Sequence, residues 1–185
     1  GTPLARPEDV EIDPVTGHVL VSLTQDKDKG NLFGGILKIA EHEKDHAGSR
    51  FTSEMFLTGG KQTGFACPDN LAFDRRGGFW MASDISAKDL GRGEFREFQN
   101  NGLFYIPMSG PAAGTVIQIG SAPVDAEFTG LCFSPDGRTL FVSIQHPGEN
   151  TKVRNQFSSH WPLGGSEIPR SAVVAISGPA LDALV

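Results

Sequence analysis

An internal repeat of about sixty residues constrains the fold of this chain more than any other feature. Three segments align with one another, and the serines Ser22, Ser83 and Ser143 occupy the same place in each. Self-similarity at a fixed period is the signature of architectures built from repeated supersecondary units. We therefore expect consecutive, similar structural units along the chain. The aligned segments are residues 6–22, 67–83 and 128–143.

Each repeat begins with the sequence pattern of a β-hairpin. In the second repeat, Leu71 and Phe73 lie two residues apart, which is the side-chain period of a strand. Residues 74–78 contain Asp and Gly, which suit a tight turn, and an apolar strand follows at 79–81. The first and third repeats have the same order, with Pro and Gly in their turns. The high content of Gly (23) and Pro (12) fits many short strands joined by turns.

Further strands follow each hairpin. Four antiparallel strands per repeat make a propeller blade. We predict an all-β chain with three blades of the four-stranded type, forming part of a β-propeller, and a short helix from Pro179 to the C-terminus. Third-strand patterns lie at 35–39, 102–106 and 172–176, and fourth-strand patterns lie near 51–57 and 115–119. The blade-like repeats span about 6–60, 67–120 and 127–178.

The predicted propeller is incomplete. Propellers typically have four to eight blades, so three cannot close a ring. The third repeat also lacks a fourth strand, and the chain opens directly before an innermost strand. We therefore expect residues 1–185 to be a fragment of a longer chain. Its open edges favour a homodimer, edge pairing or partial disorder, and the alternative is an open stack kept soluble by short edges.

Charge and hydropathy exclude several functions. The formal net charge is −6, and no basic stretch is present that could neutralise nucleic-acid phosphates. The acidic balance fits a protein that gathers carboxylates around cations, although mildly acidic proteins are common. No apolar run reaches the roughly 18 residues of a membrane-spanning helix. Cys67 and Cys132 match no zinc spacing, and we predict two buried free thiols.

Polar residues gather just before the innermost strands. The loops that enter these strands meet near the axis of a propeller, so repeat-equivalent residues converge there. Carboxylates and an amide oxygen in such a ring are typical of a hard-cation site. Pro-Asp-Asn is also a common turn sequence, which leaves a structural role open for Asp69. The predicted metal ligands are Glu8, Asp9, Asp69, Asn70 and Glu127.

Arg6 and Glu8 are the predicted catalytic residues. They lie two residues apart in an extended segment and therefore on the same side, whereas Glu8 and Asp9 point to opposite faces. One of these two carboxylates is expected to face the channel and the other to bridge to the neighbouring blade. A guanidinium matches the oxygens of a phosphate. The alternative role of Arg6 is a structural ion pair with Glu8, Asp69 or Glu127.

A second polar group is expected at the channel mouth. The segment 144–149 follows the second strand of the third repeat and ends at the same strand end as Glu127. A lone histidine is more often structural than catalytic, so His146 is a candidate for either role. The mouth candidates are Thr129, Gln145, His146 and Glu149.

The chain resembles the C-terminal half of the PhoX alkaline phosphatases. The most specific motifs are Arg-Pro-Glu-Asp at 6–9 and Gln-His-Pro-Gly-Glu at 145–149. The resemblance implies a six-bladed propeller with calcium and iron on its axis, which hydrolyses phosphate monoesters in the periplasm or outside the cell. It implies that Arg6 holds the phosphate, that Glu8 bridges metals, and that Asp69, Asn70 and Glu127 lie on the calcium side.

The same resemblance implies that this piece is inactive alone. The family's iron-binding cysteine and a phosphate-contacting lysine belong to the half that is absent, and neither cysteine here stands in that place. Two alternatives stay open: a non-catalytic interaction propeller, and a hydrolase similar to the sugar lactonases with one divalent ion. Arg6 beside Glu8 favours the phosphatase, because a lactone offers no phosphate to a guanidinium.

Overall fold

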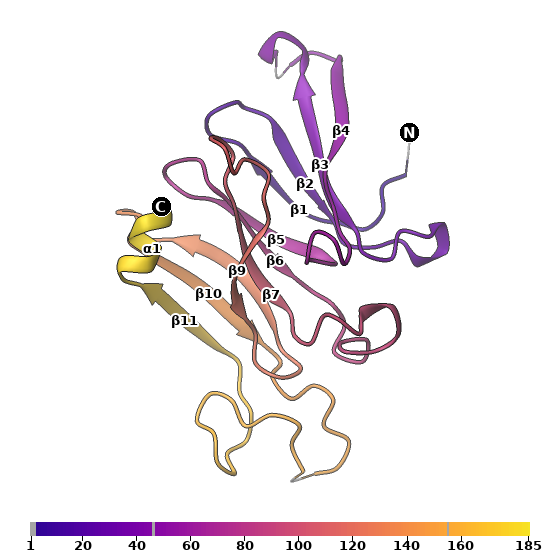
Figure 1. The fold of residues 1–185 in the computed structure, drawn as a ribbon, viewed down its shortest axis with the longest axis vertical. Coiled ribbons are helices and arrows are strands. Elements are labelled where there is room, and N and C mark those ends of the chain that lie inside the picture. The colour runs from indigo at the N-terminus through magenta and orange to yellow at the C-terminus, as the bar shows by residue number, and fades with distance from the viewer. Residues whose placement is uncertain (1–2, 46, 155) are drawn as a thin grey trace.

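The structure, a computed structural model, describes residues 3–45, 47–154 and 156–185. These residues form three antiparallel sheets, each with its strands in sequence order (Figure 1). The first sheet contains β1 (Pro7–Ile12), β2 (Val19–Leu23), β3 (Gly35–Glu41) and β4 (Phe51–Thr58). The second contains β5 (Pro68–Phe73), β6 (Phe79–Ser83), β7 (Gly102–Ile106) and β8 (Ile117–Ser121). The third contains β9 (Glu127–Phe133), β10 (Thr139–Gln145) and β11 (Ala172–Ser177).

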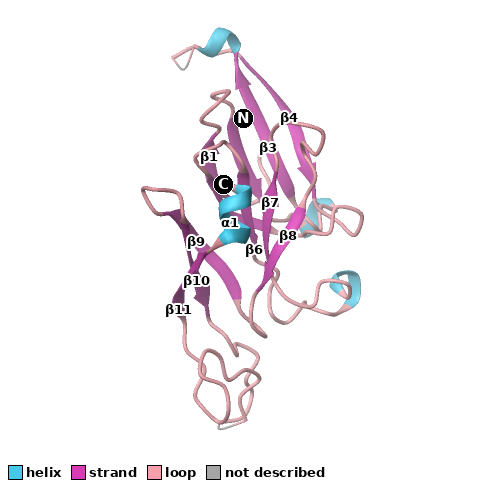
Figure 2. Ribbon diagram, turned by 60° about the vertical axis from the view of Figure 1, so that its left-hand side comes forward, coloured by secondary structure: helices cyan, strands magenta, loops and turns pink. Residues whose placement is uncertain are grey.

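Helix contributes little to the described chain. The α-helix α1 (Pro179–Leu184) follows the third sheet, as Figure 2 shows in cyan. The 3-10 turns are η1 (Lys27–Lys29), η2 (His42–Lys44) and η3 (Gly93–Phe95). No helix in the described ranges has the length and apolar character needed to cross a membrane. The prediction of an all-β, blade-like repeat is thus confirmed.

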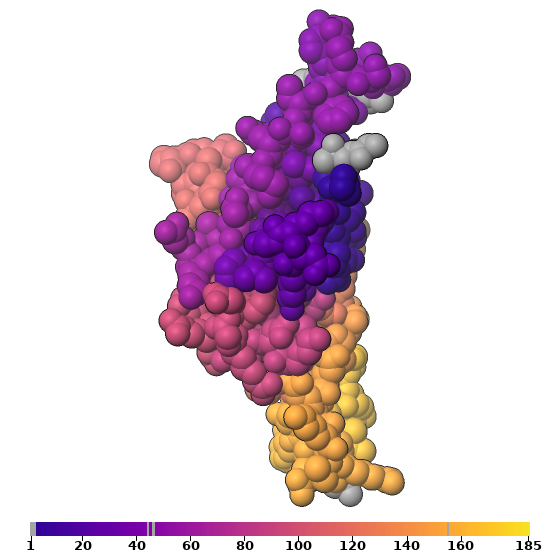
Figure 3. Space-filling view, turned by 90° about the vertical axis from the view of Figure 1, so that its right-hand side faces the viewer, coloured from indigo at the N-terminus to yellow at the C-terminus, as the bar shows by residue number. Residues whose placement is uncertain are grey.

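The three sheets stack side by side through their innermost strands. β5 packs against β1 on one side and against β9 on the other. The space-filling view shows the first repeat in indigo and purple, the second in magenta below it, and the third in orange at the far end (Figure 3). The described sheets do not close into a ring, which is the geometry of a partial propeller.

The middle sheet is buried on both faces. Phe79 and Met81 of β6 pack into an apolar cluster shared with the first sheet. Trp80 and Ala82 point the other way, into a cluster shared with the third sheet. Alternate residues of one strand therefore hold two neighbouring sheets, which explains why β6 is apolar throughout rather than amphipathic.

The hairpin turns explain two of the buried carboxylates. Asp74 Oδ1 accepts hydrogen bonds from the backbone N–H groups of Arg76 (2.8 Å) and Gly78 (2.9 Å), and its Oδ2 accepts one from Trp80 Nε1 (2.9 Å). The equivalent Asp13 accepts from the N–H of Val15 at 2.8 Å. Both carboxylates are occupied by their own turns, so they are structural.

The outer faces of the stack have no neighbouring sheet among the described residues. Val10 on β1 is 58% exposed, and Val173 on β11 is 66% exposed. The prediction that both thiols are buried is wrong for Cys132, which is exposed because it lies on this outer face of β9. Cys67 is buried, and burial raises the pKa of its thiol to about 12.

Each innermost strand has a register irregularity near its start. It falls between Pro7 and Val10 in β1, between Pro68 and Leu71 in β5, and between Thr129 and Cys132 in β9, one residue later relative to the repeat. A β-bulge changes the direction in which side chains point and is common beside functional sites. The repeat therefore places a bulge where the predicted site residues lie.

The bulges also connect successive sheets. Asp9 Oδ2 accepts a hydrogen bond from the N–H of Leu71 in the second sheet at 2.8 Å. At the equivalent place, Asn70 Oδ1 accepts one from the N–H of Gly130 in the third sheet at 2.8 Å, and another from the Thr129 hydroxyl. Asp9 and Asn70 thus hold adjacent innermost strands in a fixed relation.

Replacement of Asp9 by alanine is expected to destabilise the chain by about 1–3 kcal/mol, because the half-buried N–H of Leu71 loses its acceptor. Urea unfolding followed by tryptophan fluorescence measures the change. Asp28→Ala is the control, since Asp28 is exposed. Equal stability of the two variants would show that the bond between sheets contributes nothing.

Candidate functional site

Three carboxylates from two sheets meet at one end of the stack. Their oxygens lie within 4.8 Å of one another, and they belong to Asp69, Asp84 and Glu127. Asp69 lies in the bulge of β5, and Asp84 directly follows β6, whose Ser83 pairs with Pro68. Glu127 begins β9, which packs against β5. The cluster therefore depends on the stacking of the second sheet on the third.

Two of the three carboxyl groups, those of Asp69 and Glu127, have raised pKa values. Burial, followed by the hydrogen bond and charge of Asp84, raises the pKa of Glu127 to about 9. Burial and the charges of Asp84 and Glu8 raise the pKa of Asp69 to about 6, against the opposing effect of Arg6. Like charges so close need either a proton or a cation between them.

The donor set fits a hard cation. Calcium takes six to eight oxygens, and three carboxylates supply up to six of them, with other ligands completing the sphere. In the described chain this group contains only oxygen donors, with no thiol or imidazole among its members. Asp69, Asp84 and Glu127 thus suit calcium.

Arg6 lies near the carboxylates and is oriented by its neighbour. Its Nε and Nη2 donate to Glu8 Oε1 at 3.1 and 2.7 Å. The residue has a positive φ of 43°, which is uncommon for a side chain of this kind. The equivalent residue of the second repeat, Cys67, has a φ of 51°. The same backbone turn thus precedes both innermost strands, and it directs Arg6 toward the site.

An open cleft of about 420 Å³ is lined by Arg6 and by two of the three carboxylates, Asp84 and Glu127. Carboxylates and cationic side chains both line it, with Arg6, Lys27 and Lys88 supplying the positive charge. Lys27 is held by Asp89, with 2.9 Å between Nζ and Oδ2. The full lining is Arg6, Gln25, Lys27, Asp84, Ser86, Lys88, Asp89, Glu127, Gln145, His146 and Glu149. An anion bound here would meet both cationic side chains and a cation held by the carboxylates.

The structure brings together most of the residues singled out from the sequence. Gln145, His146 and Glu149 line the same cleft as Arg6 and Glu127. Glu8 lies beside Arg6, and the negative charge of Glu8 contributes to the raised pKa of Asp69. The oxygens of Asp9 accept from Val10 and Leu71, and Asn70 and Thr129 are joined in the contact between sheets. The proposed ligand roles of Asp9 and Asn70 therefore compete with bonds to the backbone.

Sequence reasoning missed Asp84. The signal was present in the repeat. Asp84 directly follows the second strand of its repeat, and His146 directly follows the second strand of the third repeat, which ends at Gln145. The argument that placed His146 at the mouth also applies to Asp84. The other cleft residues that were missed are Gln25, Lys27, Ser86, Lys88 and Asp89.

Comparison with known proteins assigns the chain to a family. A family model described as alkaline phosphatase PhoX matches residues 1–148, which is most of the chain. The chain belongs to the PhoX family. Among solved structures, Pseudomonas fluorescens PhoX in complex with vanadate, a transition state analogue, is similar at 30% identity and a TM-score of 0.82. A search of curated proteins finds no match.

The likeness to PhoX extends over nearly the whole of this chain but over a minor part of the solved protein. The match covers 96% of this chain and 34% of the Pseudomonas protein. The resemblance inferred from the Arg-Pro-Glu-Asp and Gln-His-Pro-Gly-Glu motifs is thereby confirmed. This PhoX-family chain thus spans about a third of the length of the relative it matches.

Proposed function

We propose that this chain supplies part of the catalytic site of a metal-dependent phosphatase that hydrolyses phosphate monoesters. The observation that carries the proposal is the cluster of three carboxylates, two of which line one open cleft together with Arg6. Membership of the PhoX family supports the reaction class. The alternative of a non-catalytic propeller has no need for such a cluster of like charges, whose mutual repulsion works against folding.

In this proposal Asp69, Asp84 and Glu127 would hold a calcium ion, and Glu8 would be a ligand of a neighbouring metal. A bound cation supplies charge neutralisation and Lewis acidity to a phosphoryl group. Arg6 presents its guanidinium fork to the phosphate oxygens and stabilises the charge that develops in the transition state. Glu8 holds that guanidinium in place before the substrate arrives, which reduces the ordering needed on binding.

The remaining parts of the proposal come from the family. We propose calcium together with iron as cofactors, a periplasmic or extracellular location, and further blades that complete the ring and the metal cluster. The chain spans about a third of the solved relative and its sheets leave two faces uncovered. We therefore expect residues 1–185 alone to be inactive toward phosphate monoesters.

Replacement of Asp84 by asparagine tests the cation site. Loss of one carboxylate charge is expected to weaken Ca²⁺ binding by at least about tenfold, because affinity depends on the number of charged ligands. Calorimetric titration of the chain with Ca²⁺ measures this, with Asp28→Asn as the exposed control.

In the full-length protein, chelation should abolish hydrolysis of p-nitrophenyl phosphate and added Ca²⁺ should restore it. Turnover that survives chelation would contradict the proposal.

A further inference from the structure

His146 stands out because its backbone is strained while its side chain is held. It follows β10 and has a φ of 38°, a region that favours glycine. Its N–H donates to Ser171 Oγ at 3.1 Å, and its carbonyl accepts from the N–H of Glu149 at 3.2 Å. Strain of this kind persists where the surroundings require one particular side-chain direction.

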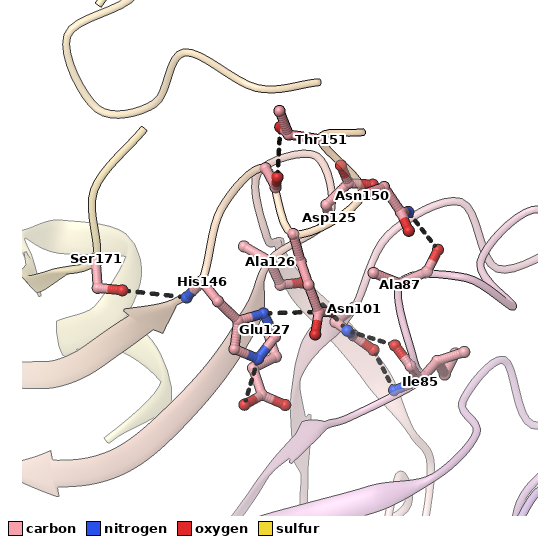
Figure 4. A network of polar contacts seen from close by, with 12 residues as sticks. Ile85, Ala87, Asn101, Asp125, Ala126, Glu127, His146, Asn150, Thr151 and Ser171 are labelled. Atoms are coloured by element: carbon pink, nitrogen blue, oxygen red, sulfur yellow. Dashed lines mark hydrogen bonds and ion pairs between the residues drawn. The ribbon is translucent and has the colours of Figure 1, made fainter. Parts of the chain in front are cut away.

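The imidazole points at Glu127. Nε2 lies 3.2 Å from Glu127 Oε1, and Figure 4 shows the ring beside that carboxyl group, with Ser171 at the backbone. The strand pairing explains the contact, since Gln145 pairs directly with Glu127 and His146 is the next residue. When a cation is bound, Glu127 is ionised and its oxygens only accept, so Nε2 carries the hydrogen in this contact. Glu127 is 6% exposed and is therefore nearly out of reach of water.

The second ring nitrogen has no hydrogen bond within the described chain. Nδ1 is buried and lies 3.6 Å from Glu149 Oε2, beyond hydrogen-bond distance. Packing alone does not account for a strained residue that leaves a buried nitrogen unsatisfied, because each feature costs stability. Within the described chain, the hydrogen-bonding contact of the ring is the one to Glu127.

We propose that His146 is a positioning residue that orients Glu127 toward the cation shared with Asp69 and Asp84. The proposal rests on the cation site of the proposed function. By donating to Oε1, the imidazole fixes the rotation of the carboxyl group and leaves Oε2 for the ion. Partners of this kind, which hydrogen-bond to a metal ligand, set its orientation and strengthen metal binding.

Calcium binding to the 185-residue chain tests this role without any assay of activity. His146→Leu removes the donor and is expected to weaken the affinity for Ca²⁺ by about 10- to 100-fold. His146→Gln keeps an N–H donor and should recover part of that loss. His42→Gln, an exposed histidine at the far tip of the first sheet, is the matched control and should bind as the wild type does.

His146→Gly separates positioning from a structural role. Glycine adopts a positive φ without strain, so this variant should unfold at the wild-type temperature or above it while losing the same Ca²⁺ affinity as His146→Leu. Wild-type affinity in the Leu and Gly variants would overturn the positioning role and leave the cation site intact. A wild-type chain that binds no Ca²⁺ would overturn both the cation site and the inference.

Discussion

Replacement of Arg6 by alanine is expected to lower kcat/KM for a phosphate monoester by about a hundred- to a thousand-fold in the full-length protein. Arg6 is the guanidinium that faces the cleft beside the carboxylate cluster, with two of its N–H groups already held by Glu8. Removal of one preorganised donor to the charge of a transition state has an effect of about this size. Hydrolysis of p-nitrophenyl phosphate across substrate concentrations measures kcat and KM separately.

The effect should fall on catalysis rather than on folding. The ion pair with Glu8 is exposed, with 53% of the Arg6 side chain accessible, and exposed pairs contribute little to stability. Arg6→Lys should recover only part of the activity, because an ammonium lacks the planar fork. Arg50→Ala is the matched control, since Arg50 is exposed and lies outside the cleft. A change of kcat/KM below about threefold in Arg6→Ala would leave Arg6 a structural partner of Glu8.

The metal-free chain is expected to lose stability as the pH rises from 5 to 8. Folding raises the pKa of Glu127 from 4.5 to about 9 and that of Asp69 from 3.8 to about 6. A carboxyl group whose pKa is raised by folding binds its proton more tightly in the folded state. The stabilising effect of this proton is complete below the pKa that the group has in the unfolded chain. It is lost as the pH rises toward the pKa that the group has in the folded chain. The slope reaches about 1.4 kcal/mol per pH unit for each proton.

Calcium should reverse this trend. The ion binds the deprotonated carboxylates, so its stabilising effect grows with pH and reaches about 2.7 kcal/mol at a hundred times its Kd. Urea unfolding at pH 5 and pH 8, with chelator and with Ca²⁺, measures both slopes. Glu127→Gln should flatten the metal-free slope, whereas Glu94→Gln, an exposed change, should leave it unaltered. A metal-free chain that is more stable at pH 8 would contradict the buried cluster.

Local sequence was sufficient to predict the blades. The two-residue alternation of Leu71 and Phe73, the turn at 74–78 and the apolar strand after it are short-range features, and each repeat contains them independently. The repeat itself then predicted which residues occupy equivalent places. Arg6 and Cys67 indeed share a positive φ, and Asp9 and Asn70 each accept hydrogen bonds from the next sheet.

The composition of the site depended on contacts that no short segment contains. Glu127 joins Asp69 and Asp84 only because β9 packs against β5, and this stacking brings together residues from two repeats. The burial that raises the pKa of Glu127 arises from the same packing.

The sequence by itself determined the strand pattern, the repeat and the residue types available for a cation site, because these follow from periodicity and side-chain chemistry. The tertiary structure decided how those residues are used. At the bulges, Asp9 and Asn70 each accept a hydrogen bond from a backbone N–H group of the next sheet. Asp84, in contrast, lines the cleft. The tertiary structure also decided that Cys132 is exposed, since burial of a sheet face requires a neighbouring sheet and β9 has none on that side in the described chain.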